Sequence, residues 1–190
     1  MSLAPSVPTE LDERFRRAAG AEHLLDVRYD LIDSPIGPLL LARSTRGLCR
    51  IEFDPEPERA AEQLARTFGL RVLRTPGGLD SERSQLDEYF RGDRTDFELE
   101  LDLSLAPTFH RIVLDRLAQV PYGAVTTYGT LAREAGRPQA ARAVGTVMNR
   151  NPIPIVLPCH RVIGSTGKLV GYGGGLHRKE RLLRLEGALV

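Results

Sequence analysis

Hydrophobic and polar residues alternate in the first half of the chain as half-buried strands require. Residues 27–32, 39–42 and 48–53 carry this pattern or a short apolar run, and Ser34–Pro38 has the proline and glycine of a turn. These segments predict a small antiparallel meander of three strands. Residues 97–103 alternate again, with acidic residues on one face, which predicts a further strand.

Apolar residues at helical spacing predict helices in both halves of the chain and dominate the second half. Helices are expected at residues 58–68, 81–90, 109–119, 128–135, 139–149 and 177–185, and a short one at 11–21. Thr108 is placed to cap the helix that follows it, and Thr126 or Thr127 the next, while Pro138 suits a first turn. Gly136 ends one short helix just before another, which predicts a helix-turn-helix DNA-binding unit or an ordinary helical hairpin.

Length and charge divide the chain into unlike parts. Its 190 residues allow two small domains with a core. We expect an N-terminal extension over 1–25, an α/β support domain over 26–105 and a mostly α-helical domain over 106–190. Residues 1–107 carry 14 arginines and 21 acidic residues, a balance of −7, whereas residues 108–190 carry 12 basic and 4 acidic residues, a balance of +8. The second half therefore suits a polyanion, although uneven scatter of surface charge gives the same sums.

The cysteine content and the hydropathy exclude several classes of protein. Cys49 and Cys159 are far apart and give neither a disulfide framework nor the spacing of a zinc site. The chain starts with no apolar run of signal-peptide type, and no segment approaches the length of a membrane span. We expect a cytoplasmic protein with no membrane association, no metal and no cofactor.

Cys159 has neighbours that a buried structural cysteine does not need. It follows the apolar run Ile153–Pro158 and precedes His160. Proline restricts the backbone that aims the sulfur, and an imidazole accepts the proton that must leave to form a thiolate. Cys159 is therefore a candidate nucleophile. The glycine run Gly171–Gly175 lets the backbone approach something flat or bulky, but it lacks the spacing of a nucleotide-binding loop.

These features together resemble the O6-alkylguanine–DNA alkyltransferases, and Pro158–Val162 resembles the active-site signature of that family. Other matching segments are Ser34–Leu39, Pro121–Gly123, Thr127–Tyr128, Ala141–Gly145, Asn151–Pro152, Gly171–Leu176 and Leu182–Gly187. The likeness covers roughly residues 27–187 and is most specific over 121–187. It implies a ribonuclease-H-like α/β N-terminal domain with a small antiparallel sheet, and a mostly α-helical C-terminal domain with a helix-turn-helix.

The resemblance implies direct-reversal DNA repair, in which an alkyl group such as methyl moves from O6 of guanine to Cys159. The product is a thioether, which has no carbonyl for water to attack, so each molecule acts once. His160 would draw the thiol proton through a water molecule, and Glu186 would orient His160. Tyr128 would protonate or hydrogen-bond N3 of the leaving guanine. Without the resemblance, Glu186 looks like a surface acid and Tyr128 like a core residue.

The implied partner is double-stranded DNA that contains O6-alkylguanine, and the damaged base has to be flipped out of the stack. Arg142 matches the arginine that fills the resulting gap. Its helix also carries Ala141 and other small residues, which suits the minor groove. Asn151 matches the hinge between this helix and the active-site loop, and Thr127 and Arg161 complete the expected DNA-contacting residues.

The flipped base is expected in a pocket formed by Val162, Tyr172, Gly173 and Lys179. Backbone groups around Val162 and Gly173 would hydrogen-bond the base, and Lys179 matches a lysine that lines the pocket. We expect a monomer. The residues leave open which alkyl groups fit and whether O4-alkylthymine is a second substrate.

The chain departs from the family pattern at two positions and leaves three alternatives. His110 and Leu114 stand where many members have Gln and Trp, and the chain has no tryptophan; we expect altered packing rather than altered chemistry. An alkyltransferase-like protein that binds the lesion without catalysis lacks the cysteine that Cys159 supplies. A bifunctional transcription factor needs a cysteine cluster in the first half. A Cys–His hydrolase needs an oxyanion hole, a role that the glycine run would have to fill.

Overall fold

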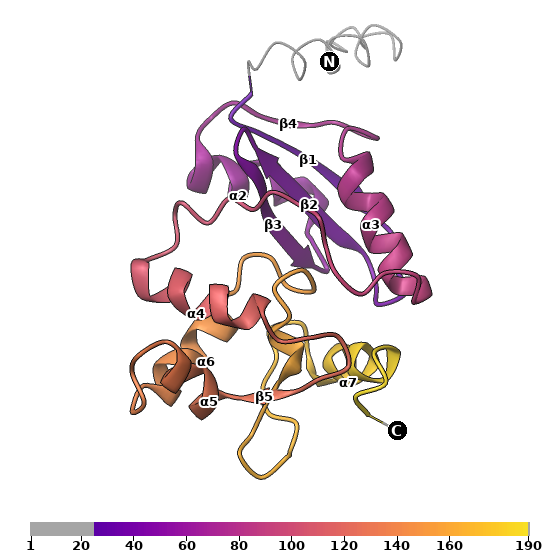
Figure 1. Cartoon of the computed structure of the whole chain (residues 1–190). Coiled ribbons are helices and arrows are strands. Elements are labelled where there is room, and N and C mark those ends of the chain that lie inside the picture. The colour runs from indigo at the N-terminus through magenta and orange to yellow at the C-terminus, as the bar shows by residue number, and fades with distance from the viewer. Residues whose placement is uncertain (1–24, 190) are drawn as a thin grey trace, which may run out of the picture.

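The computed structural model describes residues 25–189, so the helix expected at residues 11–21 lies outside the described residues (Figure 1). The N-terminal half contains the strands β1 (Val27–Ile32), β2 (Leu39–Ser44), β3 (Gly47–Phe53) and β4 (Val72–Arg74), paired in the order β3-β2-β1-β4. The first three strands form the predicted antiparallel meander. β4 pairs in parallel with β1, so the small sheet is mixed and the expected antiparallel pairing holds for β1–β3. The chain passes through a helix before β4, and such a crossover can return a strand in the same direction.

Strand β2 is apolar on both faces because the sheet is covered on both sides. Leu40 and Ala42 belong to a small cluster with Ala60 and Leu64 of helix α2 (Pro57–Phe68). Leu39 and Leu41 alternate with them and belong to the main core, which also contains residues of helix α3 (Asp80–Arg91) and of the second half. The sheet is therefore the middle layer, with α2 against one face, and α3 and the C-terminal half against the other.

Residues 97–103 do not form the strand that their alternation predicted. Only Leu101 makes a bridge, with Leu48 of β3. Leu48 donates from its backbone N to Glu100 O at 2.8 Å, and Asp102 N donates to Leu48 O at 2.8 Å. The apolar side chains of the segment, Phe97, Leu99, Leu101 and Leu103, still pack against the core. An extended segment with one paired residue is enough to bury alternate side chains.

The C-terminal half is mostly helical, as predicted. It contains α4 (Thr108–Ala118), β5 (Thr126–Thr127), α5 (Tyr128–Glu134), α6 (Ala141–Asn149), the 3-10 turn η1 (Cys159–Arg161), β6 (Val162–Ile163) and α7 (Leu176–Leu185). β5 and β6 pair in parallel and place Thr126 beside Val162. The two short helices α5 and α6 are joined by residues 135–140, in which Gly136 adopts a φ of 75°, so the predicted helix–turn–helix arrangement is present.

Local capping differs from the prediction at two of three helix starts. Thr127 caps α5, because its side-chain oxygen accepts a hydrogen bond from Thr130 N at 3.1 Å. Thr108 is the first residue of α4 and makes no side-chain cap. α6 begins at Ala141 rather than residue 139, because Ala140 N donates to Arg137 O at 2.9 Å and closes a turn there.

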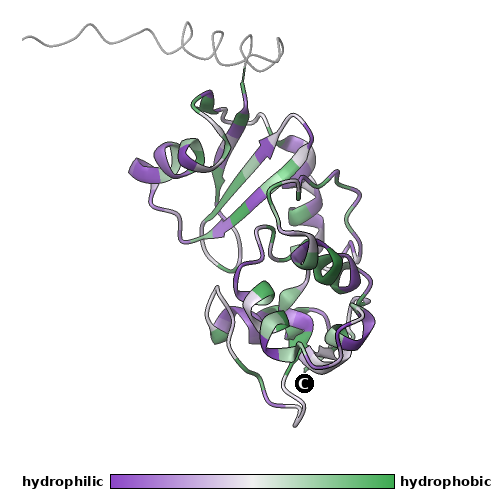
Figure 2. Cartoon of the chain, turned by 90° about the vertical axis from the view of Figure 1, so that its left-hand side faces the viewer, coloured by the Kyte–Doolittle hydropathy of each residue, from purple (hydrophilic) through white to green (hydrophobic). Residues whose placement is uncertain are grey.

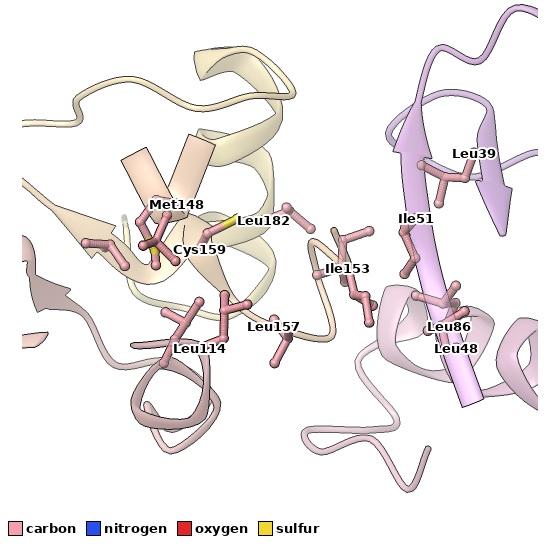
Figure 3. Packing of buried hydrophobic residues seen from close by; sticks show 14 of the residues in the cluster. Leu39, Leu48, Ile51, Leu86, Leu114, Met148, Ile153, Leu157, Cys159 and Leu182 are labelled. Atoms are coloured by element: carbon pink, nitrogen blue, oxygen red, sulfur yellow. The ribbon is translucent and has the colours of Figure 1, made fainter. Parts of the chain in front are cut away.

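One core runs through both halves of the chain. Ile153, in the loop after α6, lies between Ile51 of β3 and Leu157 of the C-terminal half (Figure 3). The backbone N of Ile51 also donates to Pro152 O at 2.9 Å. Ile155 in the same loop has a φ of 76°, which β-branched residues rarely adopt, and it is fully buried. Packing from both halves thus holds this loop in place.

A view turned by 90° shows the two halves one above the other, with hydrophobic residues in the strands and helices of each (Figure 2). The polypeptide crosses between them at residues 104–107, and the loop after α6 returns to the sheet. None of the described helices is long and apolar enough to cross a membrane.

We predict that Ile153→Ala lowers the free energy of unfolding by about 2–5 kcal/mol, because it opens a cavity between the two halves. Chemical denaturation at neutral pH measures the change. Ile112→Ala removes the same atoms from a side chain that is 40% exposed, and it should stay within about 0.5 kcal/mol of the parent. Equal losses in the two variants would contradict the shared core.

Candidate active site

Cys159 opens the turn η1 directly after Pro158 and is 5% exposed. It faces a pocket of about 460 Å³. The pocket is lined by β3 residues Arg50–Phe53, by Met148–Pro152 and Pro154, and by Cys159 and Tyr172–Gly174. The nucleophile candidate thus lies in a cavity with one wall from the N-terminal half, which the sequence had not indicated.

The thiol of Cys159 is held in its protonated form. Burial raises its pKa to about 11, although Asn151, Lys179 and Tyr172 act in the opposite direction. A thiol with this pKa is not a thiolate at neutral pH, so attack requires a base that removes the proton.

His160 is the candidate base and is fully buried. Its Nε2 lies 2.8 Å from Glu186 Oε1, and a carboxylate partner fixes the proton on that nitrogen. Within residues 25–189, Nδ1 of His160 has no hydrogen-bond partner, so this atom is the free acceptor of the ring. Burial lowers the pKa of His160, although Glu186 raises it. The imidazole is therefore neutral at neutral pH and able to accept a proton.

Glu186 is the centre of a buried polar cluster that it forms with Tyr89, His160 and Arg161. Its Oε1 accepts hydrogen bonds from Tyr89 Oη at 2.6 Å and from Arg161 Nη2 at 2.9 Å, in addition to His160. Its Oε2 accepts from Arg161 Nε at 2.9 Å. Burial alone would raise the pKa of Glu186, but the hydrogen bonds from His160, Arg161 and Tyr89 outweigh it and lower the pKa to about 2. The carboxylate is thus ionised throughout the physiological range.

The position of Arg161 corrects its expected role. We predicted a contact with DNA, but Arg161 is 5% exposed and forms a two-pronged pair with Glu186. Its Nη1 also donates to Val120 O at 2.5 Å. Burying the carboxylate requires a positive charge beside it, and Arg161 supplies that charge. The guanidinium is consequently not available to a phosphate.

Asn151 and Tyr172 both line the pocket that contains Cys159. Asn151 donates from Nδ2 to Leu157 O at 2.8 Å, and its Oδ1 accepts from Ile153 N at 3.1 Å. It therefore ties the end of α6 to the loop that leads to Cys159. The hydroxyl of Tyr172 is buried beside Cys159, and burial together with the neighbouring sulfur raises the pKa of this phenol well above its ordinary value.

The glycine run approaches a flat group that belongs to the protein itself. A Cβ on Gly174 would lie 2.7 Å from ring atoms of Phe53, closer than carbon atoms approach. A Cβ on Gly173 would meet only Asn149 O, at 3.8 Å, so Gly173 faces the open part of the pocket. Phe53 was missed from the sequence because nothing there pairs it with a loop 120 residues later.

Val162 and Lys179 support the pocket from behind and are not among its lining residues. Lys179 is fully buried, and its Nζ donates to Val162 O at 2.5 Å and to Val170 O at 2.9 Å. Lys179 thus does not line the pocket as expected, because a buried ammonium group needs carbonyl partners and takes that of Val162. The expected hydrogen bond from the backbone around Val162 to the base stays a prediction. Burial lowers the pKa of Lys179.

Tyr128 and Thr127 stand at the start of α5, beside the active-site turn. Burial raises the pKa of Tyr128, and a charge on Cys159 raises it further, which places the phenol close to the thiol. A Cβ on Gly145 of α6 would lie 3.9 Å from the Tyr128 ring. Thr127 pairs with Ile163 next to η1. Both residues thus lie at the end of the helix-turn-helix that is next to the active-site turn.

Helix α6 has one buried and one exposed face. Val144, Val147 and Met148 are buried in the core. Arg142 lies on the exposed face, and Ala141, at the start of the helix, is half-buried. Arg142 is therefore available to an external partner, unlike Arg161.

The second cysteine, Cys49, is not a candidate nucleophile. Cys49 lies in the cluster between the sheet and α2, and its Sγ donates to Ala42 O at 3.2 Å. Burial raises its pKa to about 12. Among residues 25–189 no group of three or more His, Cys, Asp or Glu side chains is arranged to hold a metal ion.

Tyr89 was not predicted as a site residue. It lies on the apolar face of α3, where the spacing indicates only a core position, and its hydroxyl meets a carboxylate 97 residues away in sequence. The sequence offered one signal of a polar role for Tyr89, its residue type, since a buried tyrosine usually finds a hydrogen-bond partner. That rule does not name the partner.

Comparison with known proteins assigns both halves of the chain. A family model described as 6-O-methylguanine DNA methyltransferase, ribonuclease-like domain, matches residues 27–103, and one described as the DNA binding domain of the same enzyme matches residues 108–188. The chain belongs to the O6-methylguanine DNA methyltransferase family.

Curated relatives and solved structures of this family agree with the match. A methylated-DNA–protein-cysteine methyltransferase of Mycobacterium tuberculosis H37Rv is 44% identical over 160 residues, 84% of this chain and 92% of the relative. One from Methanosarcina barkeri is 44% identical and covers 83% and 96%. The crystal structure of Mycobacterium tuberculosis OGT in complex with DNA has a TM-score of 0.74 at 42% identity and covers 85% and 93%.

We predict that the ionised Glu186 makes stability depend on pH in the acid range. Its pKa is about 2 in the folded protein and 4.5 as an ordinary glutamate, so its contribution is fully present above pH 4.5 and is lost as the pH falls towards 2. The loss amounts to about 3 kcal/mol. Urea unfolding at a series of pH values measures this slope.

Glu186→Gln should be less stable at neutral pH, because it leaves Arg161 buried without a negative partner. It should also show a smaller loss of stability between pH 4.5 and pH 2. Glu180→Gln, at the surface of α7, should keep the parent slope. A parent slope in Glu186→Gln would contradict the assignment.

Proposed function

We propose that this methyltransferase-family protein repairs DNA by direct reversal: it moves an alkyl group, methyl in the first instance, from O6 of guanine in duplex DNA to Cys159. The observation that carries the proposal is the cysteine itself, in a pocket, next to a neutral buried imidazole that is held by an ionised carboxylate. The relatives' name, methylated-DNA–protein-cysteine methyltransferase, describes the same transfer. A relative was crystallised with DNA.

The reaction balances with the residues of the site. The bond between Cys159 Sγ and the alkyl carbon forms while the bond from that carbon to guanine O6 breaks, and the electron pair of the broken bond stays on the base. The thiol proton passes to His160 Nδ1, directly or through one water molecule, because Nε2 is engaged with Glu186. The Tyr128 hydroxyl donates to N3 of the leaving guanine. The thioether is not hydrolysed, so each molecule turns over once.

The helix-turn-helix supplies the contact with DNA in this proposal. α6 approaches the minor groove with its exposed face, where Ala141 allows close contact, and Arg142 enters the stack in place of the flipped base. Thr127 lies at the start of the preceding helix, and Asn151 links α6 to the loop that carries the nucleophile. Affinity for duplex falls as the salt concentration rises, because phosphate contacts release counterions.

The flipped base occupies the pocket beside Cys159, with Tyr172 and the backbone of Gly173 as its walls. Lys179 acts indirectly. Its Nζ donates hydrogen bonds to the carbonyls of Val162, directly after η1, and of Val170, directly before the glycine run, and so holds these two segments together. O4-alkylthymine carries its alkyl group on a similar exocyclic oxygen of a smaller base. We include it as a second candidate substrate, since the pocket of about 460 Å³ has room for it.

The remaining proposals concern organisation. We place an α/β support domain at residues 26–105 and the DNA-binding and active-site domain at 106–190, which the family-model matches at 27–103 and 108–188 support. The pocket is complete within one chain, which supports a monomer. Two free cysteines suit the reducing cytoplasm.

The proposed transfer predicts a covalent change that intact-protein mass spectrometry detects. After incubation with a duplex that carries one O6-methylguanine, the protein should gain one methylene unit in a one-to-one ratio with the lesion. Peptide mapping should place the label on Cys159. Cys49→Ala should react like the parent, whereas Cys159→Ala should bind the duplex without any gain of mass. No gain of mass in the parent, or a label on Cys49, would overturn the proposed function.

The proposed place of Arg142 in the stack predicts a loss that depends on the form of the substrate. Arg142→Ala should slow transfer from the duplex by roughly tenfold or more, because unstacking a base costs a few kcal/mol. Transfer from free O6-methylguanine, which is not stacked, should keep the parent rate. Arg181→Ala, an exposed arginine on α7, is the matched control. Equal slowing on both substrates would remove the flipping role.

A further inference from the structure

We propose that Tyr89, in α3 of the N-terminal half, is a positioning residue of the active site: its hydroxyl holds the Glu186 carboxylate and thereby sets the proton affinity of His160. The inference rests on the proposed function in so far as His160 serves alkyl transfer. It gives the N-terminal half a part in the chemistry, beyond the support of the fold.

Three donors converge on one oxygen of Glu186. Tyr89 Oη lies 2.6 Å from Oε1, His160 Nε2 lies 2.8 Å from it and Arg161 Nη2 lies 2.9 Å from it. A carboxylate oxygen has two lone pairs, so the donors share its charge. Every additional donor reduces the negative charge that remains to stabilise a protonated imidazole. The Tyr89 hydroxyl therefore weakens the hold of Glu186 on the imidazolium and keeps His160 neutral.

Packing fixes the ring of Tyr89 and therefore the direction of its hydroxyl. The residue is 0% exposed. Its ring contacts those of Phe90, Phe97 and Tyr122 at centroid distances of 5.5, 5.4 and 6.0 Å. A phenylalanine would fill the same apolar space, so the packing alone does not account for the hydroxyl. A buried hydroxyl needs a hydrogen-bond acceptor, and for Tyr89 on α3 this acceptor is Glu186.

The other polar groups around the cluster come from the C-terminal half. Arg161 belongs to η1, Tyr122 to the segment before β5, and Lys179 to α7. The charge of Lys179 acts on His160 and lowers its pKa, as does that of Arg161, in addition to burial. Among the hydrogen-bond partners of Glu186 in residues 25–189, Tyr89 alone comes from the N-terminal half. The hydroxyl of Tyr122 donates instead to Leu185 O at 3.0 Å.

The test measures how readily Cys159 loses its proton, without DNA. In a Cys49→Ala background, which leaves one thiol, the rate of Cys159 alkylation by iodoacetamide is followed against pH. The lower limb of this profile reports the loss of a proton from the paired cysteine and histidine. Tyr89→Phe should move this limb to higher pH by about half a unit, because Glu186 then holds the imidazolium more strongly.

Tyr122→Phe is the matched control, because it removes a neighbouring phenol that bonds a backbone carbonyl, and its limb should coincide with that of the parent. A limb that stays in place in Tyr89→Phe would overturn the proposal, since a purely structural tyrosine changes stability without changing the limb. Equal shifts in the two variants would overturn it as well.

A second replacement keeps the proposal testable if Tyr89→Phe does not fold. 3-Fluorotyrosine placed at position 89 keeps the shape of the residue and makes its hydroxyl a stronger donor. The limb should then move to lower pH, opposite to the shift in Tyr89→Phe. No shift, or a shift to higher pH, would overturn the role of the hydroxyl.

Methyl transfer from the O6-methylguanine duplex is measured in parallel by protein mass. If the parent transfers nothing while the limb shifts as described, the proposed function fails and the role of Tyr89 stands. If the parent transfers methyl but the limb does not respond to Tyr89, the proposed function stands and the role of Tyr89 fails.

Discussion

Burying a carboxylate removes it from water, so the chain has to supply donors for both oxygens of Glu186. Tyr89, His160 and Arg161 do so, and they come from α3 and from the turn that carries the nucleophile. Separating α3 or η1 from Glu186 would leave its buried charge without a donor, so the carboxylate stabilises the contact between these elements. The same requirement fixes the tautomer of His160 and leaves Nδ1 free. Stability and chemistry thus depend on one ionised group.

The candidate nucleophile, Cys159, is placed by packing. Ile153 fills the space between the sheet and the C-terminal half, and buried Ile155 holds a backbone conformation that its side chain disfavours. Asn151 ties the start of this loop to the carbonyl of Leu157, just before Cys159. The sulfur is therefore positioned by apolar contacts from both halves, while the hydrogen-bonded polar residues around Glu186 include the proposed base, His160.

The alternation of apolar residues predicted the meander, and helical spacing predicted the main helices, because those signals are local. The motif around Cys159 made Cys159 and His160 the candidates for nucleophile and base for the same reason. Arg161 and Lys179 were misplaced, since an exposed and a buried cation look alike in a sequence, and burial depends on partners such as Glu186 that lie 25 residues away. Tyr89 was missed for that reason too, as were the contacts of Phe53 with the glycine run.

The shared core also limits where this polypeptide can be divided. Cutting between the family-model matches, at residues 104–107, would expose Ile153 on one fragment and Ile51 on the other. It would also take the Tyr89 hydroxyl away from Glu186. A C-terminal fragment used alone as a DNA-binding tool would therefore keep the helices proposed to contact DNA, but it would carry an exposed apolar surface and a His160 whose carboxylate partner has lost one donor.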